Sequence, residues 1–425
     1  MLKRIAPDQL RLGMYVQEIP GPWMNHPFWR GSFKLEKYED LKTLRSAKIE
    51  QILIDTTKGR DIVMEDEPKA AVVAPAAAET SPEAAAPATE TPAAPCTEAT
   101  RPRQAKIVVH VGAEQERVQA ARVLTGSRKA IMTMFNETRM GKALDMRQAM
   151  PVVQEITASV ARNSGALISL ARLKTADDYT YMHSVAVCAL MIALGHQLGL
   201  SAEETRQAGI AGLLHDIGKM AVPAELLNKP GKLTDDEFTS IKKHAQAGHA
   251  ILRGVDGIGD AALDVSLHHH EKIDGSGYPF NLKGNQISMV AKMGAVCDVY
   301  DAITSNRPYK PGWEPGHSVK RMANNQGHFD ETILEAFIKS VGIFPTGSCV
   351  VMQSGKVGIV IDQHPGSLLT PKVKVFFSAL TLAPLPIEII DLATTRSGDK
   401  IASHADPAKL HLPNLETIWA SAAIA

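Results

Sequence analysis

The sequence has no excess of charge of either sign, few cysteines and no long hydrophobic run. Lysine plus arginine and aspartate plus glutamate each total 46 in 425 residues, so the formal net charge is zero. Proteins that bind long nucleic acids normally carry a basic excess, because phosphate neutralisation supplies most of their affinity. The composition therefore argues against DNA as a partner, although a small phosphorylated ligand needs only a few local cations.

The four cysteines, Cys96, Cys188, Cys297 and Cys349, are far apart in the sequence and form no CxxC pair. This pattern does not indicate a disulfide framework and favours a reducing compartment. The N-terminal residues lack the apolar core of a signal peptide. The longest apolar run, residues 185–194, is roughly half of a membrane span. We expect a cytoplasmic protein with no membrane segment.

Residues 65–104 are rich in alanine, proline, glutamate and threonine and have almost no large apolar side chains. Such a segment buries too little surface to offset its ordering entropy, so it is predicted to be a disordered linker. Residues 1–64 before it mix short strand-like runs with one helix-like stretch and predict a small α+β domain. Its aromatic cluster around Trp23, Phe28, Trp29 and Phe33 is either a small core or a ligand or partner face.

Residues 105–340 are mainly helical in pattern, with apolar positions recurring every three or four residues. Thr234 with Glu237 forms a capping box, and Ser288 precedes a long apolar helix that runs to about residue 304. Apolar and polar residues alternate at 348–352 and 356–361 around Ser354-Gly355, which predicts a hairpin, and further strands are predicted at 373–377 and 386–390. We therefore predict a mainly α protein, in which a helical bundle is followed by a small β-rich region over residues 341–425.

Histidines are concentrated between residues 183 and 270, where eight of the fifteen occur. His215 and Asp216 directly follow the apolar run 210–214. Adjacent residues of a helix diverge by about 100°, so these two side chains can approach one metal ion from neighbouring directions. A mixed set of imidazoles and carboxylates suits iron, manganese or zinc.

Asp298 lies in an otherwise apolar helix, where a carboxylate without a partner would be costly. A metal ion removes that cost. His183 lies on a preceding predicted helix and His244 on the helix that Thr234 caps, and the His268–His270 run follows. These predicted helices could pack on one another. Any single histidine is more often an ordinary hydrogen-bonded residue, but together they predict a metal centre. His196 and His249 do not fit the pattern.

Three strings then identify a resemblance: HDIGK at 215–219, HHEKIDGSGYP at 269–279 and CDVYDAITSNRPYK at 297–310. They resemble the HD-GYP family of bacterial cyclic di-GMP phosphodiesterases over roughly residues 175–340. The resemblance implies a helical HD-type bundle with a binuclear, sometimes trinuclear, centre of iron or manganese, with zinc, nickel and magnesium as alternatives. The string DQLRLGMYVQEIPGPWMNHPF at 8–28 also resembles an uncharacterised domain that often precedes HD-GYP modules.

Carried over by position, the resemblance implies a set of metal ligands in which Asp216 bridges the two ions. The ligands of the first ion are His183, His215, Asp216 and Asp298, and those of the second are Asp216, His244, His269 and His270. The family's third ion goes with a glutamate four residues before the first histidine. Tyr179 occupies that position here, and a neutral phenol is a poor ligand, so two ions are expected.

The resemblance also implies the residues that bind substrate. Lys219 matches the lysine on the scissile phosphate, and Arg307 and Lys310 match a phosphate-binding pair. The loop with Gly277, Tyr278 and Pro279 would shape the pocket and contact a diguanylate cyclase. Lys272 stands where the family usually has arginine and lacks its planar fork.

Asp274 and Asp301 are either partners that orient the metal-binding imidazoles or ordinary turn and helix residues. With two metal ions, a hydroxide that bridges them is expected to attack phosphorus in line. Lys219 would stabilise the charge that develops on the equatorial phosphoryl oxygens. Asp216 would hold the two metal ions that the hydroxide bridges.

The expected product is 5′-pGpG, and whether a second cleavage gives GMP is left open. Two alternatives remain: a receptor that binds cyclic di-GMP or docks a cyclase without catalysis, and an HD hydrolase of another nucleotide, such as cyclic GMP-AMP or a guanosine polyphosphate. A homodimer is left open as well.

Overall fold

The computed structural model describes residues 2–18, 33–36, 38–46, 51–60, 111–173, 179–227, 229, 231–306, 312–364, 366–407, 409, 410, 412, 415 and 418. The predicted linker at 65–104, Cys96, the aromatic residues Trp23, Phe28 and Trp29, and the predicted phosphate-binding residues Arg307 and Lys310 lie outside these residues. The chain divides into two compact units, one that contains the N-terminal strands and one that spans residues 108–425.

The N-terminal unit is a four-stranded antiparallel sheet with one helix. Its strands lie in the order β1-β4-β2-β3. The elements are β1 (Leu2–Ile5), β2 (Tyr15–Glu18), β3 (Phe33–Lys34), α1 (Tyr38–Ser46) and β4 (Ile52–Asp55). Leu10, Met14, Leu35, Ile52 and Ile54 are fully buried and form a small core. The small α+β unit predicted from the sequence is therefore present.

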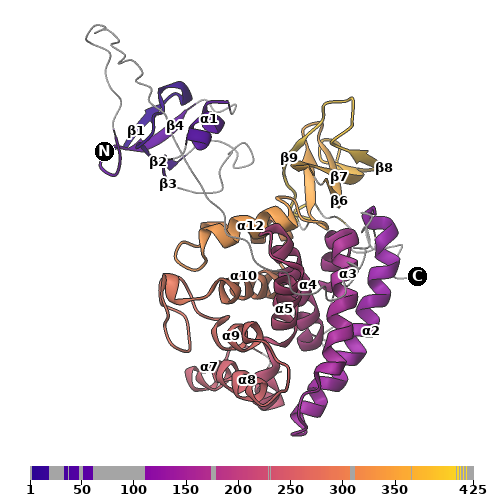
Figure 1. Ribbon diagram of the computed structural model, residues 1–425. Coiled ribbons are helices and arrows are strands. Elements are labelled where there is room, and N and C mark those ends of the chain that lie inside the picture. The colour runs from indigo at the N-terminus through magenta and orange to yellow at the C-terminus, as the bar shows by residue number, and fades with distance from the viewer. Residues whose placement is uncertain are drawn as a thin grey trace, which may run out of the picture. The chain divides into compact units, whose positions relative to one another are not determined.

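The second unit is a bundle of helices with a small sheet at one end (Figure 1). Its helices are α2 (Ala113–Arg139), α3 (Met146–Ala171), α4 (Tyr179–Gln197), α5 (Ala202–Leu214), α6 (Ala224–Leu227), α7 (Asp235–Lys242), α8 (His244–Arg253), α9 (Asp260–His268), α10 (Met289–Thr304), α11 (Pro315–Asn324) and α12 (Glu331–Val341). Short 3-10 turns are η3 (Ile217–Ala221) and η4 (Gly284–Gln286).

Helix α4 is the centre of the bundle. Every residue of α4 from Met182 to Gly195 is buried, because α3, α5, α10 and α12 all pack against it. This explains why its sequence is an almost continuous apolar run rather than an amphipathic one. A polar side chain on such a helix lies inside the protein, and His183 is in this position.

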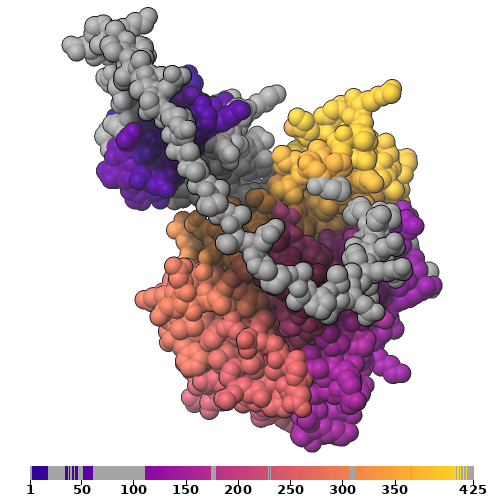
Figure 2. Space-filling view, viewed as in Figure 1, coloured from indigo at the N-terminus to yellow at the C-terminus, as the bar shows by residue number. Residues whose placement is uncertain are grey.

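The C-terminal residues form a five-stranded antiparallel sheet in the order β8-β7-β6-β5-β9. The strands are β5 (Cys349–Met352), β6 (Lys356–His364), β7 (Ser367–Ser378), β8 (Ala383–Asp391) and β9 (Ile401–His404). Gly355, in the turn of the predicted β5–β6 hairpin, has a φ of 78°, a conformation that glycine adopts without a steric cost. In space-filling form, these strands occupy one end of the second unit and α2 forms one flank (Figure 2).

The residue at a kink in α3 forms hydrogen bonds that join this sheet to the bundle. Asn163 has φ −164° and ψ 102°, and its Oδ1 accepts a hydrogen bond from the Ala166 amide at 3.0 Å, so it caps the second half of the helix. Its Nδ2 donates to Oδ1 of Asp362 in β6 at 3.1 Å. Arg117 of α2 donates to the Ile361 carbonyl at 2.9 Å. The bundle and the sheet therefore share a buried polar contact as well as apolar packing.

Candidate metal centre

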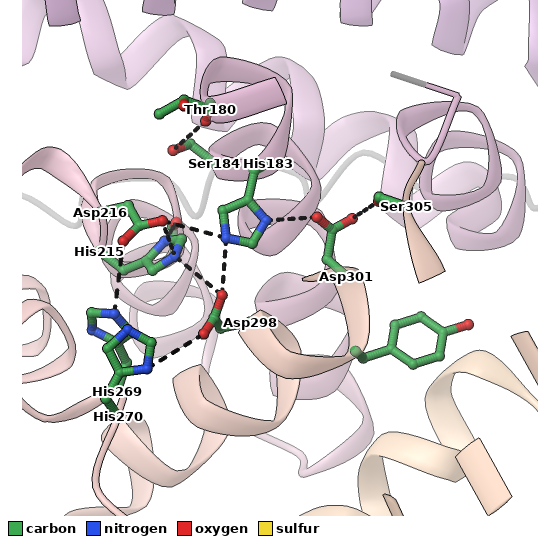
Figure 3. Close-up of polar contacts among 12 residues, drawn as sticks. Thr180, His183, Ser184, His215, Asp216, His269, His270, Asp298, Asp301 and Ser305 are labelled. Carbon is green, nitrogen blue, oxygen red and sulfur yellow. Dashed lines mark hydrogen bonds and ion pairs between the residues drawn. The ribbon is translucent and has the colours of Figure 1, made fainter. Parts of the chain in front are cut away.

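The seven side chains predicted to bind metal come from five separate places in the bundle, and the six labelled in Figure 3 point towards one region between them. His183 is near the start of α4, and Asp298 is in the middle of α10. His215 and Asp216 follow α5. His269 and His270 follow α9, and His244 is the first residue of α8. The seven ligands predicted from the sequence are therefore brought together by the fold.

The two carboxylates lie among the imidazoles. Nε2 of His183 is 2.9 Å from Oδ1 of Asp298 and 3.4 Å from Oδ2 of Asp216. Nε2 of His215 is 3.3 Å from the same Asp216 oxygen. The other oxygen of Asp216 lies 3.3 Å from Nε2 of His244. Asp216 therefore faces both groups of histidines with one oxygen each, as expected of a bridging ligand.

Each of four imidazoles is held through its other nitrogen. Nδ1 of His215, His244 and His269 lies 2.8 Å from a backbone carbonyl oxygen. Nδ1 of His183 lies 2.6 Å from Oδ2 of Asp301. Because a carbonyl or an ionised carboxylate only accepts, Nδ1 carries a hydrogen, and Nε2 of each ring faces the centre. This is the tautomer that a metal-binding histidine needs.

Several of these atoms have no partner in the protein. Nε2 of His215 and Oδ1 of Asp216 are buried and make no hydrogen bond. Nε2 of His244 and Nε2 of His269 face each other at 3.3 Å, with both Nδ1 atoms already hydrogen-bonded to carbonyls. Two lone pairs in that arrangement repel each other unless a cation lies near them.

The potential ligand atoms form three overlapping groups, and within each group the atoms lie within 4.8 Å of one another. The groups are His183, His215 and Asp298; His215, Asp216 and His269; and His244, His269 and His270. The donor set therefore fits divalent metal ions.

The surroundings favour neutral imidazoles at His269 and His270 and ionised carboxylates at Asp216 and Asp298. Burial lowers the pKa of His270 to about 3 and lowers that of His269 well below its usual value. Burial would raise the pKa of Asp216 and Asp298, but nearby cationic groups and hydrogen bonds hold both well below the usual value. Neutral imidazoles and ionised carboxylates are the forms that bind a metal ion.

His215 differs from the other rings. Its burial opposes the charged form, but the adjacent carboxylates of Asp216 and Asp298 outweigh burial and raise the pKa of His215 to about 10. In the metal-free protein this ring is therefore an imidazolium that neutralises part of the buried negative charge. A metal ion would replace its proton.

Two local predictions about these ligands are wrong. His215 and Asp216 were expected on a helix, but α5 ends at Leu214, and Asp216 has φ −100° and ψ 11°. His244 was expected on the helix that Thr234 caps, but that helix ends at Lys242 and His244 begins α8. Thr234 does form the predicted capping box with Glu237. In both places a break in the helix turns the ligand towards the centre.

Close backbone contact holds the turn after Asp216. A Cβ atom at Gly218 would lie 1.9 Å from the His244 carbonyl oxygen and 2.4 Å from the Gly248 nitrogen. Only glycine allows η3 to lie this close to α8, and this approach brings Asp216 and His244 together. The sequence contained Gly218 within the HDIGK string, but its role depends on contacts that only the fold creates.

Lys219 extends from the same turn. Its ammonium group contacts Oδ2 of Asp216, and its side chain is 23% exposed. It is therefore a cation at the edge of the centre that solvent or substrate can reach. Tyr179 lies one turn before His183 and stacks on it, with ring centroids 5.8 Å apart and planes at 7°. No carboxylate occupies this position.

The loop after His270 folds over the centre. The Tyr278 ring lies 4.6 Å from the His270 ring, and the Lys242 ammonium lies 5.3 Å from the Tyr278 ring centroid. Burial raises the pKa of Tyr278, so its phenol stays neutral. A Cβ atom at Gly277 would lie 2.4 Å from the Lys272 nitrogen, so the loop packs tightly against the residues that follow the ligands.

Glu271 holds this loop in place, a role that the sequence motifs did not indicate. Its side chain is 2% exposed, and its two oxygens accept hydrogen bonds from the Phe280 amide at 2.7 Å and the Leu282 amide at 3.0 Å. An acidic residue directly after the two histidines, before a glycine-rich turn, was a signal that could have drawn attention to it.

Asp274 and Asp301, each of which could orient an imidazole or be an ordinary turn or helix residue, make different contacts. Asp301 holds Nδ1 of His183 and accepts a hydrogen bond from Ser305 Oγ at 3.1 Å. Asp274 accepts a hydrogen bond from the Ser276 amide at 2.8 Å and thus stabilises a turn. The contacts therefore favour an orienting role for Asp301 and a turn role for Asp274.

Two matches to protein families cover most of the chain. Residues 2–149 match a domain of unknown function, DUF3391, and residues 143–333 match the HD domain. The chain is 48% identical over 420 residues to the "Cyclic di-GMP phosphodiesterase PA4108" of Pseudomonas aeruginosa, covering 99% of this chain and 96% of the relative.

Two other relatives match over a shorter region. The "Cyclic di-GMP phosphodiesterase response regulator RpfG" of Xanthomonas campestris pv. campestris is 39% identical over 180 residues, which are 40% of this chain and 47% of that protein. The "3′3′-cGAMP-specific phosphodiesterase 1" of Vibrio cholerae is 33% identical over 165 residues, 38% of each chain. With its HD domain, the converging histidines and aspartates and a relative matched over nearly its whole length, the chain belongs to the HD-GYP family.

Proposed function

We propose that this chain hydrolyses cyclic di-GMP to linear 5′-pGpG at the centre built around Asp216. The observation that carries the proposal is the buried set of imidazoles and carboxylates, whose potential ligand atoms lie within 4.8 Å of one another in three overlapping groups. The names of two relatives, including the one matched over nearly its whole length, give the substrate class.

We propose two divalent metal ions, iron or manganese, with zinc, nickel or magnesium as alternatives. His183, His215 and Asp298 would hold one ion, and His244, His269 and His270 would hold the other. Asp216 would contact both, because each of its oxygens faces one group. Divalent ions at such a site acidify water and neutralise charge on phosphoryl oxygens.

The side chains of this chain would position the substrate and stabilise charge. Lys219 is placed to pair with a phosphoryl oxygen that gains charge as the ring opens, and such a preorganised cation lowers the barrier. Tyr278 and Gly277 would form one wall of the site, since their loop packs on His270. Arg307 and Lys310, which lie outside the described residues, are proposed to bind phosphate oxygens, arginine through two parallel hydrogen bonds.

The first test is Asp216→Ala, assayed on cyclic di-GMP after anaerobic loading with Fe²⁺ or Mn²⁺. We expect loss of pGpG formation and of bound metal with helicity retained. Asp256→Ala, at an exposed aspartate on the loop after α8, is the matched control and should behave as wild type. Activity retained in Asp216→Ala would rule out the proposed centre.

Substrate choice is a separate question, because a Vibrio cholerae relative is named for 3′3′-cGAMP. Turnover of cyclic di-GMP, 3′3′-cGAMP and a guanosine polyphosphate should be compared on one preparation. We expect the highest kcat/KM for cyclic di-GMP. A preference for either of the other nucleotides would overturn the substrate, and binding without turnover of any would identify a receptor. The same assay shows whether pGpG is cleaved further to GMP.

We propose that the loop at Gly277–Pro279 contacts a diguanylate cyclase; Phe280, next to it, is 51% exposed. We propose a cytoplasmic location and leave a homodimer open. Among the described residues, no helix has the length and apolar character needed to cross a membrane.

A further inference from the structure

A cavity of about 840 Å³ lies where the end of α10, helix α11 and the C-terminal sheet meet. Its walls include Arg172, Thr304, Trp313, Arg321, Cys349 and Ala405. No residue of the His–Asp centre lines it, so it is distinct from the metal site. Its volume is within the range of small-molecule sites, roughly 300–1,000 Å³.

Three cationic side chains line this cavity. The Arg321 guanidinium lies over the Trp313 ring, 4.6 Å from its centroid. A guanidinium that lies over an indole face can still present its N–H groups to a phosphate or carboxylate in a bidentate manner. Lys320 and Arg172 line the same cavity. Arg172 is anchored through Nη1 to the Thr346 carbonyl at 3.0 Å, whereas its Nε is buried without a hydrogen-bond partner.

Two carboxylates also line the cavity, but both have other partners. Glu314 accepts a hydrogen bond from the His317 amide at 2.7 Å and lies 3.4 Å from Nδ1 of His404. Asp406 lies 3.9 Å from the Lys409 ammonium. Three cationic side chains therefore line the cavity against two carboxylates, which favours an anionic ligand.

The rest of the wall suits an organic body rather than a bare ion. Leu173, Pro315, Cys349, Ala405, Pro407 and Leu415 supply apolar surface. Oε1 of Glu314 is buried and has no hydrogen-bond partner. An acceptor with unmet hydrogen bonding favours a ligand that also carries N–H donors. A purine nucleotide combines a phosphate, a flat apolar ring system and, on the ring edge, such donors.

We propose that this cavity binds a purine mononucleotide, with its phosphate at Arg321, Lys320 and Arg172 and its base towards Glu314. The site goes beyond the proposed hydrolysis and does not depend on it. Thr304, which lines the cavity, is the last residue of α10, the helix that carries Asp298 and Asp301. A ligand in the cavity therefore contacts the end of a helix that supplies the metal centre.

The test is calorimetric titration of GMP into the full chain, kept metal-free with EDTA so that no metal can hold the nucleotide. We expect one GMP per chain and a loss of affinity of roughly tenfold or more in Arg321→Ala, because a charge-assisted hydrogen bond is removed. Arg253→Ala, at an exposed arginine of α8, is the matched control and should bind GMP as wild type does. Arg321 is exposed, so its replacement should leave the thermal melt unchanged.

Three comparisons locate the site and define the ligand. Asp216→Ala should bind GMP normally, since Asp216 does not line the cavity. Guanosine and inorganic phosphate, each titrated alone, should bind at least about tenfold more weakly than GMP, and AMP should compete with GMP. The proposal is overturned if wild type binds no GMP at millimolar concentration, if Arg321→Ala binds as wild type, or if Asp216→Ala loses binding. Phosphate that binds as tightly as GMP would reduce the site to a simple anion site and overturn the nucleotide assignment.

Discussion

Asp301 holds the ring of His183 from behind: its carboxylate lies 2.6 Å from Nδ1, while Nε2 of the same ring is 2.9 Å from Asp298. The two aspartates are three residues apart on α10, so both lie on the side of that helix that faces α4. Asp301 in turn accepts from Ser305 Oγ at 3.1 Å. One helix therefore supplies a candidate ligand and the group that orients a second one.

Asp301→Asn should weaken metal binding while leaving the fold intact. Asparagine cannot stabilise the Nδ1–H form of His183 as a carboxylate does, and loss of such partners typically costs about 10–100-fold in metal affinity. Competition with a chelator, followed by metal analysis, measures the change. Asp256→Asn, at an exposed aspartate, is the control. Wild-type metal affinity in Asp301→Asn would remove Asp301 from the orienting role.

Glu271→Gln should reduce hydrolysis without removing metal. The neutral amide has one acceptor oxygen, so it cannot accept from both the Phe280 and Leu282 amides as the carboxylate does. The loop that carries Tyr278 would then be held less firmly over His270. We expect kcat/KM on cyclic di-GMP to fall about tenfold, since hydrogen bonds to charged groups contribute roughly 1.5–3 kcal/mol. Glu225→Gln, at an exposed glutamate, should have no effect. A loss of metal in Glu271→Gln would show instead that Glu271 supports the ligands directly.

Gly218→Ala should separate η3 from α8 and thereby disrupt the metal centre. The added Cβ would collide with the His244 carbonyl, and backbone atoms cannot move aside as a flexible side chain can. Overpacking of this kind typically destabilises by about 1–3 kcal/mol. Chemical unfolding and metal content measure both effects. Gly254→Ala is the control, because its Cβ would meet only the Ile251 carbonyl, at 3.6 Å. If Gly218→Ala binds metal and melts as wild type, the close approach is not required.

The metal-free protein should be most stable near neutral pH. The pKa of His215 is raised to about 10, so the stability that its charge contributes is complete below the unfolded-state value and is lost as pH rises through 10. The pKa of His270 is lowered to about 3, so the stability from its neutral form is present above its unfolded-state pKa and is lost as pH falls towards 3. Each group can contribute a slope of at most about 1.4 kcal/mol per pH unit.

Urea unfolding of EDTA-treated protein at several pH values tests this profile. Loading with Mn²⁺ should remove the alkaline decline, because the metal replaces the proton on His215. Calorimetry at pH 8 in buffers of different ionisation enthalpy should then show release of about one proton as metal binds. His317→Gln, at an exposed histidine, should leave the profile unchanged. Stability that keeps rising from pH 7 to pH 10 without metal would contradict the assignment of a charged His215.

The sequence was sufficient to predict the mainly helical bundle and the β-rich end. Apolar spacing marked the helices, and Ser288 caps α10 through the Ala291 amide, as predicted. Asp298 was identified because a carboxylate in an apolar helix requires a partner, and the short strings around His215 and His269 carried the family resemblance. Each of these signals is local: it depends on neighbours within a few positions along the chain.

The helix breaks, the roles of several residues and the cavity depend on contacts between distant parts of the chain. The breaks before His215 and His244 were not predicted, because they depend on how η3 packs against α8. The roles of Gly218, Glu271 and Asp301 depend on backbone and side-chain groups from other elements, and so does the cavity beside Trp313. Residue types and their spacing thus determined which side chains could bind metal. Only the packing of α4, α5, α8, α9 and α10 determined which nitrogen of each imidazole faces the centre and which groups hold that imidazole in place.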